Sequence, residues 1–395
     1  MKRISHLTRG LYTILLSVVL LQPAAAEGYD ALAYMDSVEF SLITCSPHEE
    51  VYSLYGHTAL RFKDLHQGKR EDVVFNWGVF DYNKPHFVAR FVLGMTDYEL
   101  GLAPMMPFLR YYYRWGSSVT EQVLNLTAEE KLALNMALEE NYLEENRVYR
   151  YNYFYDNCST RPRDISERSI NGKVVYNPQP DYEPSFREMI GEKTHNHPWA
   201  TWGNNMLLGV KADLATSRQE QEFLPDRLMA DFSRAQISGS DGSWRPLVKE
   251  ERLLVAPGVQ VIERDFVLTP MECFVLLLAL SVLLFLVEWK RRKTFKYWDA
   301  TLMVVTGTAG CLLFIMIFSQ HPTTSLNLQL LLVNPIHLAF LPAVLRRRRT
   351  RYWRLLAVMT VLFLAGAFFQ HYAEGMLILA LCLLLRFWIH YRNEK

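Results

Sequence analysis

The hydrophobic positions of this chain follow two different patterns, which meet near residue 269. Before that point, short stretches alternate apolar and polar residues, which is the spacing of strands with one buried face. Beyond it, apolar residues form long runs broken by basic clusters, which is typical of membrane-spanning helices. We therefore predict a mixed domain followed by a membrane domain. The predicted strands cover residues 37–45, 57–64, 72–82 and 117–126.

Helices are predicted between those strands. A short one is expected over residues 85–94. Thr127 and Glu130 have the spacing of a capping box, so a longer helix should begin there and continue across residues 131–146. Another is predicted over residues 158–170, with a proline in its first turn, where the missing N–H costs least. Residues 27–268 thus form an α+β domain of roughly 240 residues, long enough for a sizeable core.

The tail carries five apolar runs. A spanning helix needs about 20 mostly apolar residues; the first three runs meet that length and the last two are shorter. Basic clusters end the first, third and fifth runs, so the positive-inside rule puts those ends in the cytoplasm. We predict an all-α bundle of five transmembrane helices within residues 269–395. The runs cover residues 269–289, 299–319, 326–345, 355–369 and 376–391.

The first 26 residues have the basic start, apolar centre and Ala-rich end of a secretory signal peptide, with cleavage expected after Ala26. An uncleaved anchor helix is the alternative. Cleavage places the soluble domain outside the cytoplasm and agrees with every basic cluster of the tail. We expect a multi-pass protein of the bacterial inner membrane whose soluble domain faces the periplasm. The linker to the first span is expected over residues 238–246 or 259–267.

Charge and motifs narrow the possible chemistry. The net charge is +1 and no basic stripe covers the soluble part, so nucleic acid is not an expected partner. The HExxH, GxSxG, P-loop and dinucleotide motifs are absent. Because the histidines also lack ligand spacing, we expect neither a metal nor another cofactor.

Several polar residues of the tail lie near the outer half of the membrane in this topology. Polar groups at such depth usually face a bundle interior or a cavity. Two interpretations of His321 and Asn327 remain possible: they line a rim that faces the substrate, or they have only a structural role. Asn334 is expected to kink a helix with the proline that follows it, and we interpret the remaining two histidines, His337 and His371, as loop residues. Arg386 is expected to snorkel toward the cytoplasmic surface.

The cysteines supply the candidate nucleophile. Of the five, three lie in apolar runs, where a free thiol packs as a small hydrophobe. Cys45 and Cys158 share the oxidising outer compartment, so a structural disulfide between them is one interpretation. Against it, Cys158 lies at a predicted helix start, where the helix dipole lowers a thiol pKa from about 8.5 toward neutrality. Asp156 and Asn157 are candidate caps there, and Arg161 would strengthen the effect if it folds back.

A thiol nucleophile needs a base, and His57 is the best candidate. The glycine before it allows a close backbone approach, and the strand that follows would fix the ring. His48, His66 and His86 compete with it from loop-like positions. A third group should orient the imidazole through its other nitrogen. Asn76 on the next strand fits this role, with Tyr55 and Asp81 as alternatives.

Several segments together resemble a known family. The order of a histidine strand before a cysteine helix resembles circularly permuted papain-like proteins, such as the NlpC/P60-like and lecithin:retinol acyltransferase-like groups. More closely, six segments are similar to the Bacteroidetes-type lipoprotein N-acyltransferase (Lnb) family, in which a periplasmic domain is fused to a membrane bundle. These segments are residues 44–62, 75–82, 156–161, 207–214, 223–229 and 319–335.

The resemblance implies acyl transfer at the membrane surface. Cys158 would take a fatty acyl chain from a phospholipid donor, with His57 as its base. The α-amine of a diacylated lipoprotein would then receive the chain from the thioester. The aromatic run over residues 108–116 would either seat acyl chains or belong to the core.

Two other functions stay open. The first is a membrane-anchored cysteine hydrolase that acts on cell-wall peptide or lipid and uses water as acceptor. The second is a non-enzymatic receptor or assembly protein in which Cys45 and Cys158 form a disulfide.

Overall fold

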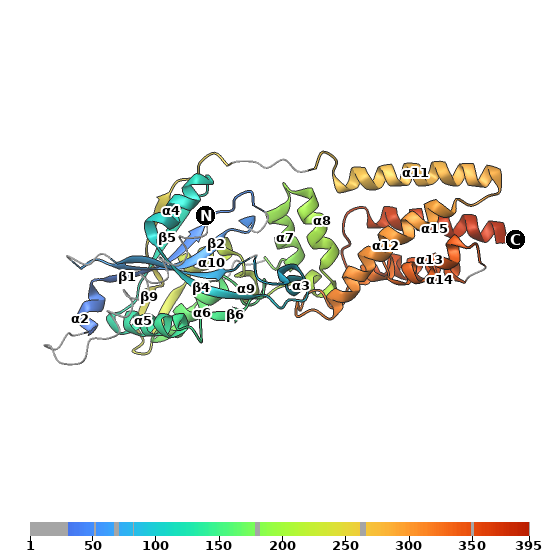
Figure 1. The fold of residues 1–395 in the computed structure, drawn as a ribbon. Coiled ribbons are helices and arrows are strands. Elements are labelled where there is room, and N and C mark those ends of the chain that lie inside the picture. Colours follow the sequence, from blue (N-terminus) through green and yellow to red (C-terminus); the bar gives the residue numbers. More distant parts are fainter. Residues whose placement is uncertain are drawn as a thin grey trace.

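The computed structural model describes residues 31–50, 53–66, 71–81, 83–177, 182–260, 266–348 and 351–394. The signal peptide expected over residues 1–26 and the middle of the second expected linker lie outside these ranges. Figure 1 shows an elongated molecule with a sheet-containing domain at one end and a helical bundle at the other. Helices α7 (Phe186–Thr194) and α8 (Pro198–Leu207) lie between the two parts.

A seven-stranded antiparallel sheet forms the centre of the first domain. Its order is β10-β5-β1-β2-β3-β4-β6. All four predicted strands are confirmed, whereas β4, β6 and β10 were not predicted. The strands are β1 (Val38–Cys45), β2 (His57–Asp64), β3 (Asp72–Val79), β4 (Asp97–Pro104), β5 (Val119–Leu124), β6 (Val148–Arg150) and β10 (Val248–Val255).

A second sheet has three strands, β7 (Gly172–Val175), β8 (Gln236–Gly239) and β9 (Trp244–Pro246), in the order β7-β8-β9. The prediction of a linker over residues 238–246 is therefore wrong, because these residues belong to the hairpin that β8 and β9 form. Its turn contains Gly242 at φ 84°, and Asp241 accepts hydrogen bonds from the backbone and side chain of Ser243. A turn of this kind has the same Gly/Ser/Asp composition as a linker.

Helices cover both faces of the main sheet, with α4 on one side and α5 and α6 on the other (Figure 1). Along β1, Phe40 and Leu42 pack into the core formed with α5, α6 and α10, whereas Ile43 and Cys45 pack against α4. This is the two-residue alternation of a strand. The helices of the domain are α2 (Ala31–Asp36), α3 (Phe87–Val92), α4 (Met105–Arg114), α5 (Ala128–Tyr142), α6 (Thr160–Arg168), α9 (Arg218–Gln221) and α10 (Pro225–Arg234).

The capping box predicted for the long helix is present at the start of α5. The Thr127 hydroxyl accepts from the Glu130 N–H, and the Glu130 carboxylate accepts from the Thr127 N–H at 2.8 Å. The helix ends at Tyr142, four residues before the predicted end. The acidic residues that follow are unfavourable at the negative end of a helix dipole, and the Asn146 side chain donates to the Glu140 carbonyl there.

Within its described residues, the tail has four helical stretches long and apolar enough to cross a membrane, one of them Leu328–Leu345 across η3 and α13. The helix α14 is shorter. The third run is broken as expected at Asn334 and Pro335, where the Asn334 side chain accepts from the Ile336 N–H. His337 is not a loop residue as interpreted from the sequence, because it lies buried in α13. The elements are α11 (Pro270–Arg291), α12 (Lys296–Ile317), η3 (Leu328–Leu331), α13 (Ile336–Leu345), α14 (Tyr352–Gly366) and α15 (Met376–Glu394).

The expectation that Arg386 snorkels is wrong. Its side chain is 1% exposed and lies between carboxylates of two neighbouring helices. It pairs with Glu288 of α11 and donates from Nε to Asp299 of α12 at 2.7 Å. His390, one turn further along α15, lies 3.0 Å from the second oxygen of Asp299. The positive charge of the Arg386 guanidinium is therefore neutralised inside the bundle, and the side chain does not extend to the membrane surface.

Amide side chains of the membrane domain hold the end of α8. The last carbonyls of a helix lack intrahelical partners, and three amides supply them here. Asn327 donates to the Met206 carbonyl at 2.7 Å, Gln329 to that of Asn205 at 2.8 Å, and Gln370 to that of Leu208 at 3.0 Å. We name Asn327, Gln329 and Gln370 the amide clasp. It fixes the sheet-containing domain on the bundle.

Candidate active site

His57 and Asn76 lie on one face of the main sheet, on the neighbouring strands β2 and β3. Ala59 and Val74, each two residues away, pack toward α4, so the alternation of the strands brings His57 and Asn76 to that same face. Gly56 adopts φ 79°, and a Cβ there would lie 2.7 Å from the Cys45 carbonyl oxygen. The close backbone approach expected before the histidine is present.

Cys158 lies two residues before α6 begins, in a loop that Asn157 holds. The Asn157 side-chain oxygen accepts from the N–H groups of Ser159 at 2.8 Å and Thr160 at 3.0 Å. Its amide donates to the Phe223 carbonyl at 2.8 Å. Asn157 therefore serves as a cap, as predicted. Asp156 does not, because its carboxylate is paired with Arg161.

The structure brings Cys158, His57 and Asn76 together. Nε2 of His57 lies 2.6 Å from Oδ1 of Asn76, and His57 lies close enough to Cys158 for the two groups to shift each other's pKa. Burial raises the pKa of Cys158, but the positive imidazole and its hydrogen bond outweigh burial and lower that pKa overall. Burial likewise lowers the pKa of His57, and the Cys158 thiolate and Asn76 raise it overall. Both pKa shifts favour the thiolate–imidazolium form of the pair.

A second set of contacts docks the cysteine loop on β2. The hydroxyls of Thr58 and Ser159 are buried and lie 3.0 Å apart. The Thr58 N–H donates to the Cys158 sulfur, which further favours the thiolate. Because Thr58 directly follows His57, this contact sets the position of the sulfur relative to the imidazole.

The other residues proposed around the thiol have partners of their own. Arg161 does not fold back on the sulfur: it pairs with Asp156 at 2.5 Å and its guanidinium lies 3.6 Å from the centre of the Tyr149 ring. Tyr55 accepts from the Asn204 amide at 2.9 Å, and burial raises the pKa of Tyr55 to about 12. Both residues support the walls of the site.

The competing bases lie elsewhere. His48 is buried, within 2.8 Å of the Ser53 hydroxyl, and its ring stacks on Trp115 at 4.8 Å. His66 and His86 are exposed. Asp81 is exposed and its carboxylate accepts from the Asn83 N–H.

The alternative disulfide between Cys45 and Cys158 is not formed. Cys45 and Cys158 are both free thiols. Cys45 is 1% exposed, and its hydrogen bond is with Tyr112 of α4. Burial raises the pKa of Cys45 well above its ordinary value, so this thiol ionises less readily than Cys158. The aromatic run over residues 108–116 is divided, since Phe108 and Tyr112 belong to the core while Tyr113 is exposed.

The polar residues of the tail are placed at the junction of the two domains. The ring of His321 is half-buried and its Nε2 lies 3.0 Å from the Phe91 carbonyl of α3. Asn327 is buried within the amide clasp. Exposed His371 lies beside Asp213 at 3.2 Å.

One residue of the site was missed by sequence reasoning. The register of β3 shifts between Trp77 and Val79, so Gly78 occupies a β-bulge, with φ 95°. A Cβ on Gly78 would lie 3.8 Å from the Cβ of Cys158 and 3.9 Å from Cε2 of Tyr151. A glycine inside a predicted strand is the signal that points to such a bulge.

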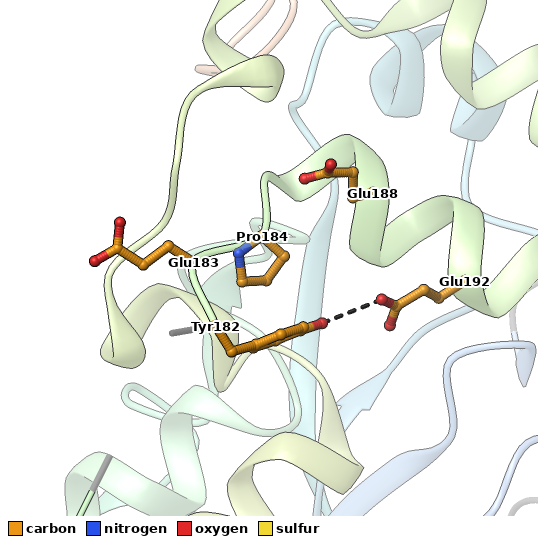
Figure 2. A pocket seen from close by; sticks show the side chains of 5 residues that line it. All are labelled: Tyr182, Glu183, Pro184, Glu188 and Glu192. Atoms are coloured by element: carbon orange, nitrogen blue, oxygen red, sulfur yellow. Dashed lines mark hydrogen bonds between the residues drawn. The ribbon is translucent and has the colours of Figure 1, made fainter. Parts of the chain in front are cut away.

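A pocket of about 470 Å³ lies apart from the thiol (Figure 2). It is lined by Tyr182, Glu183, Pro184, Glu188 and Glu192, and the Tyr182 hydroxyl donates to Glu192 at 3.1 Å. Neither Cys158 nor His57 lines it. Within the described residues, no group of three or more His, Cys, Asp or Glu side chains is arranged to hold a metal ion.

An activated thiol, an imidazole and an orienting amide, built on a sheet domain and joined to apolar helices, define a membrane-bound protein with a candidate thiol site. Two family models match the chain: the Lnb N-terminal periplasmic domain over residues 26–189 and the Lnb transmembrane domain over residues 262–395. The chain belongs to the Lnb family. No curated protein and no solved structure matches it.

The family match has two consequences for the whole chain. It supports an inner-membrane protein with a periplasmic domain, which agrees with the apolar helices of the tail. It also suggests a function like that of a lipoprotein N-acyltransferase.

The ion pair predicts the pH dependence of thiol alkylation. Iodoacetamide reacts with the thiolate, so Cys158 should be alkylated half-maximally at a pH below about 8.5, the ordinary thiol pKa. In His57→Ala, burial is no longer opposed by the imidazolium, and the midpoint should rise by about 1–3 pH units. Mass spectrometry of the Cys158 peptide measures this without interference from other cysteines. Identical midpoints in the two proteins would contradict the ion pair.

Proposed function

We propose that this protein is a thiol-dependent lipoprotein N-acyltransferase. It moves a fatty acyl chain from a phospholipid, through a thioester on Cys158, to the α-amine of a diacylglyceryl-cysteine at a lipoprotein N-terminus. The observation that carries the proposal is the contact of an activated thiol with His57, in a chain of the Lnb family joined to membrane helices. The histidine strand precedes the cysteine helix, so we also infer a circularly permuted papain-like arrangement.

The first half-reaction acylates the enzyme. The Cys158 thiolate attacks the ester carbonyl carbon of the phospholipid, and a carbon–sulfur bond forms. As the tetrahedral intermediate collapses, the bond from the carbonyl carbon to the glycerol oxygen breaks. The His57 imidazolium gives its proton to that oxygen, and a lysophospholipid leaves.

The second half-reaction transfers the chain. The neutral α-amine of the lipoprotein attacks the thioester carbonyl, a carbon–nitrogen bond forms and the carbon–sulfur bond breaks. Neutral His57 takes the proton that the nitrogen loses, which regenerates the thiolate–imidazolium pair. Asn76 holds the imidazole through Nε2 in both steps.

The oxyanion of both steps needs a donor near the sulfur. The N–H groups of Ser159 and Thr160 already donate to Asn157. The backbone donor at this helix start is therefore the N–H of Cys158 itself. Asn157 and the Asp156–Arg161 pair act as positioning residues, because they fix the loop that presents this group.

A paired-substrate assay tests the proposal against the hydrolase alternative. The full-length protein in vesicles receives a phospholipid with a labelled acyl chain and a diacylated lipopeptide. We expect the label to appear on the peptide amine and, without peptide, on Cys158. Release of free fatty acid with an unlabelled peptide would favour the hydrolase and overturn N-acyl transfer.

Replacing Asn76 tests the orienting amide. Asn76→Ala removes the group 2.6 Å from the imidazole, so the ring loses its fixed direction and we expect the rate of thioester formation to fall by about 10²-fold. Asn76→Asp should recover part of the rate because a carboxylate also accepts from Nε2. The control is Asn135→Ala, a half-buried residue of α5 whose side-chain hydrogen bond is with exposed Glu139. A wild-type rate in Asn76→Ala would remove this residue from the mechanism.

A further inference from the structure

A row of stacked aromatic rings connects the membrane domain with the candidate site. Phe91 and Phe87 of α3 stack at 6.3 Å between ring centres, and Phe87 stacks on Phe80 at 5.8 Å. Phe80 stacks on Tyr98 at 4.9 Å, and Tyr98 on Tyr151 at 4.3 Å. The angles between successive ring planes are 20–24°. We name Phe91, Phe87, Phe80, Tyr98 and Tyr151 the ring ladder.

The outer end of the ring ladder lies at the membrane domain. Phe91 is 48% exposed and its ring meets that of His321, which follows the outer end of α12. The carbonyl of Leu93 accepts from the Gln320 N–H at 2.9 Å. Val88 and Met95 beside the ladder are 74% and 40% exposed. Apolar side chains at this junction with the membrane domain can contact the outer leaflet of the bilayer, where aromatic residues are favoured.

The inner end of the ring ladder lies at the thiol. A single point, the position of a Cβ on Gly78, is 3.9 Å from the Tyr151 ring and 3.8 Å from the Cβ of Cys158. Gly78 therefore lies between the Tyr151 ring and Cys158, and a carbon atom at this point would make ordinary van der Waals contact with both. The ladder therefore extends from the membrane surface to the candidate nucleophile.

Charge at the outer end complements a phospholipid head group. Arg90 and Arg150 both pair with the single carboxylate of Asp97, at 2.6 and 2.8 Å. Their side chains are 43% and 42% exposed, and Arg150 also donates to Gln320 of the membrane domain at 2.9 Å. Two guanidinium groups on one carboxylate leave an excess positive charge that suits a phosphate.

We propose that the ring ladder is the access route of the phospholipid donor, with the phosphate beside Arg90 and Arg150. The acyl chain would lie along the partly exposed rings of Phe91, Phe87, Phe80 and Tyr151, with buried Tyr98 behind it. The proposal rests on the thioester mechanism above and adds the path by which the donor leaves the bilayer. An acyl chain that lies on aromatic side chains stays out of water while the ester group of the phospholipid moves to Cys158. This lowers the free-energy cost of extracting the phospholipid from the bilayer.

Chain-length dependence tests the route. In Phe87→Ala, a ring is lost from the middle of the ladder, so acylation of Cys158 by a long-chain phosphatidylglycerol in vesicles should fall by about tenfold or more. Acylation by dihexanoyl phosphatidylglycerol, supplied as a soluble monomer, should change by less than about twofold because this donor does not have to leave a bilayer. Trp244→Ala is the matched control, since this aromatic residue is 59% exposed on β9, outside the ladder. An equal fall with both donors, or no fall with either, would overturn the route.

Photo-cross-linking separates the route from the chemistry. A phosphatidylglycerol with a diazirine in its acyl chain is bound in vesicles to the Cys158→Ala protein, which cannot turn over. Cross-links on the peptides that carry Phe87, Phe91 or Tyr98 support the route, and their absence overturns it. If the wild-type protein forms no acyl-cysteine with either donor, the proposed function fails, while this experiment still decides the route.

Discussion

Replacing Cys158 with alanine is expected to abolish acyl transfer while leaving the fold intact. In the proposed mechanism the side chain is the nucleophile of the first half-reaction and the leaving group of the second, so its loss should lower the rate of lipopeptide acylation by at least about 10³-fold. The thioester that mass spectrometry should detect on the wild-type Cys158 peptide should also disappear. Little stability should be lost, since alanine keeps the Cβ of Cys158 and removes only one sulfur atom.

Cys45→Ser is the matched control for this experiment. Cys45 is buried, and Tyr112 offers the new hydroxyl a hydrogen-bond partner, so we expect most of the activity to remain. An equal loss of activity in both variants, with both still folded, would count against Cys158 as the nucleophile.

The second large effect concerns the stability of the bundle. Arg386→Met leaves the carboxylates of Glu288 and Asp299 buried without their cation. Breaking such a pair from one side costs about 3–5 kcal/mol. We expect a loss of this size in the free energy of unfolding, measured by denaturant titration of the protein in detergent.

Two further variants show whether the cost comes from unpaired charge. Glu288→Gln/Asp299→Asn/Arg386→Met removes all three formal charges and should recover most of the lost stability. Arg291→Met, on an exposed residue at the end of α11, should have little effect. If the triple variant is as unstable as Arg386→Met alone, lost packing and not unpaired charge explains the result.

Local signals made part of the structure predictable. The strands that hold His57 and Asn76 alternate apolar and polar residues, and the capping box at Thr127 lies within four residues. The candidate triad follows from similar information, because a glycine before His57 and an asparagine before Cys158 mark special backbone positions. Each of these features depends on residues close together in the sequence.

The remaining features depend on distant residues. Strand β10 was missed because Lys249, Glu250, Glu251 and Arg252 hide its alternation; it lies at the sheet edge, where charged residues are common. Arg386 finds its carboxylates on α11 and α12, about a hundred residues earlier in the sequence. The rings of the ladder come from the residue after β3, from α3, from β4 and from the segment before α6, and no single stretch of sequence reveals that they stack.

The amide clasp has a consequence for how such proteins can be recombined. Three side chains of the tail recognise backbone carbonyls at residues 205–208, so they read the shape of the helix end and not its side chains. In chimaeras of homologues, the amide clasp should therefore tolerate sequence differences along α8 when the helix end keeps its geometry, whereas side-chain contacts such as Arg150–Gln320 and Phe91–His321 must be matched between the two halves.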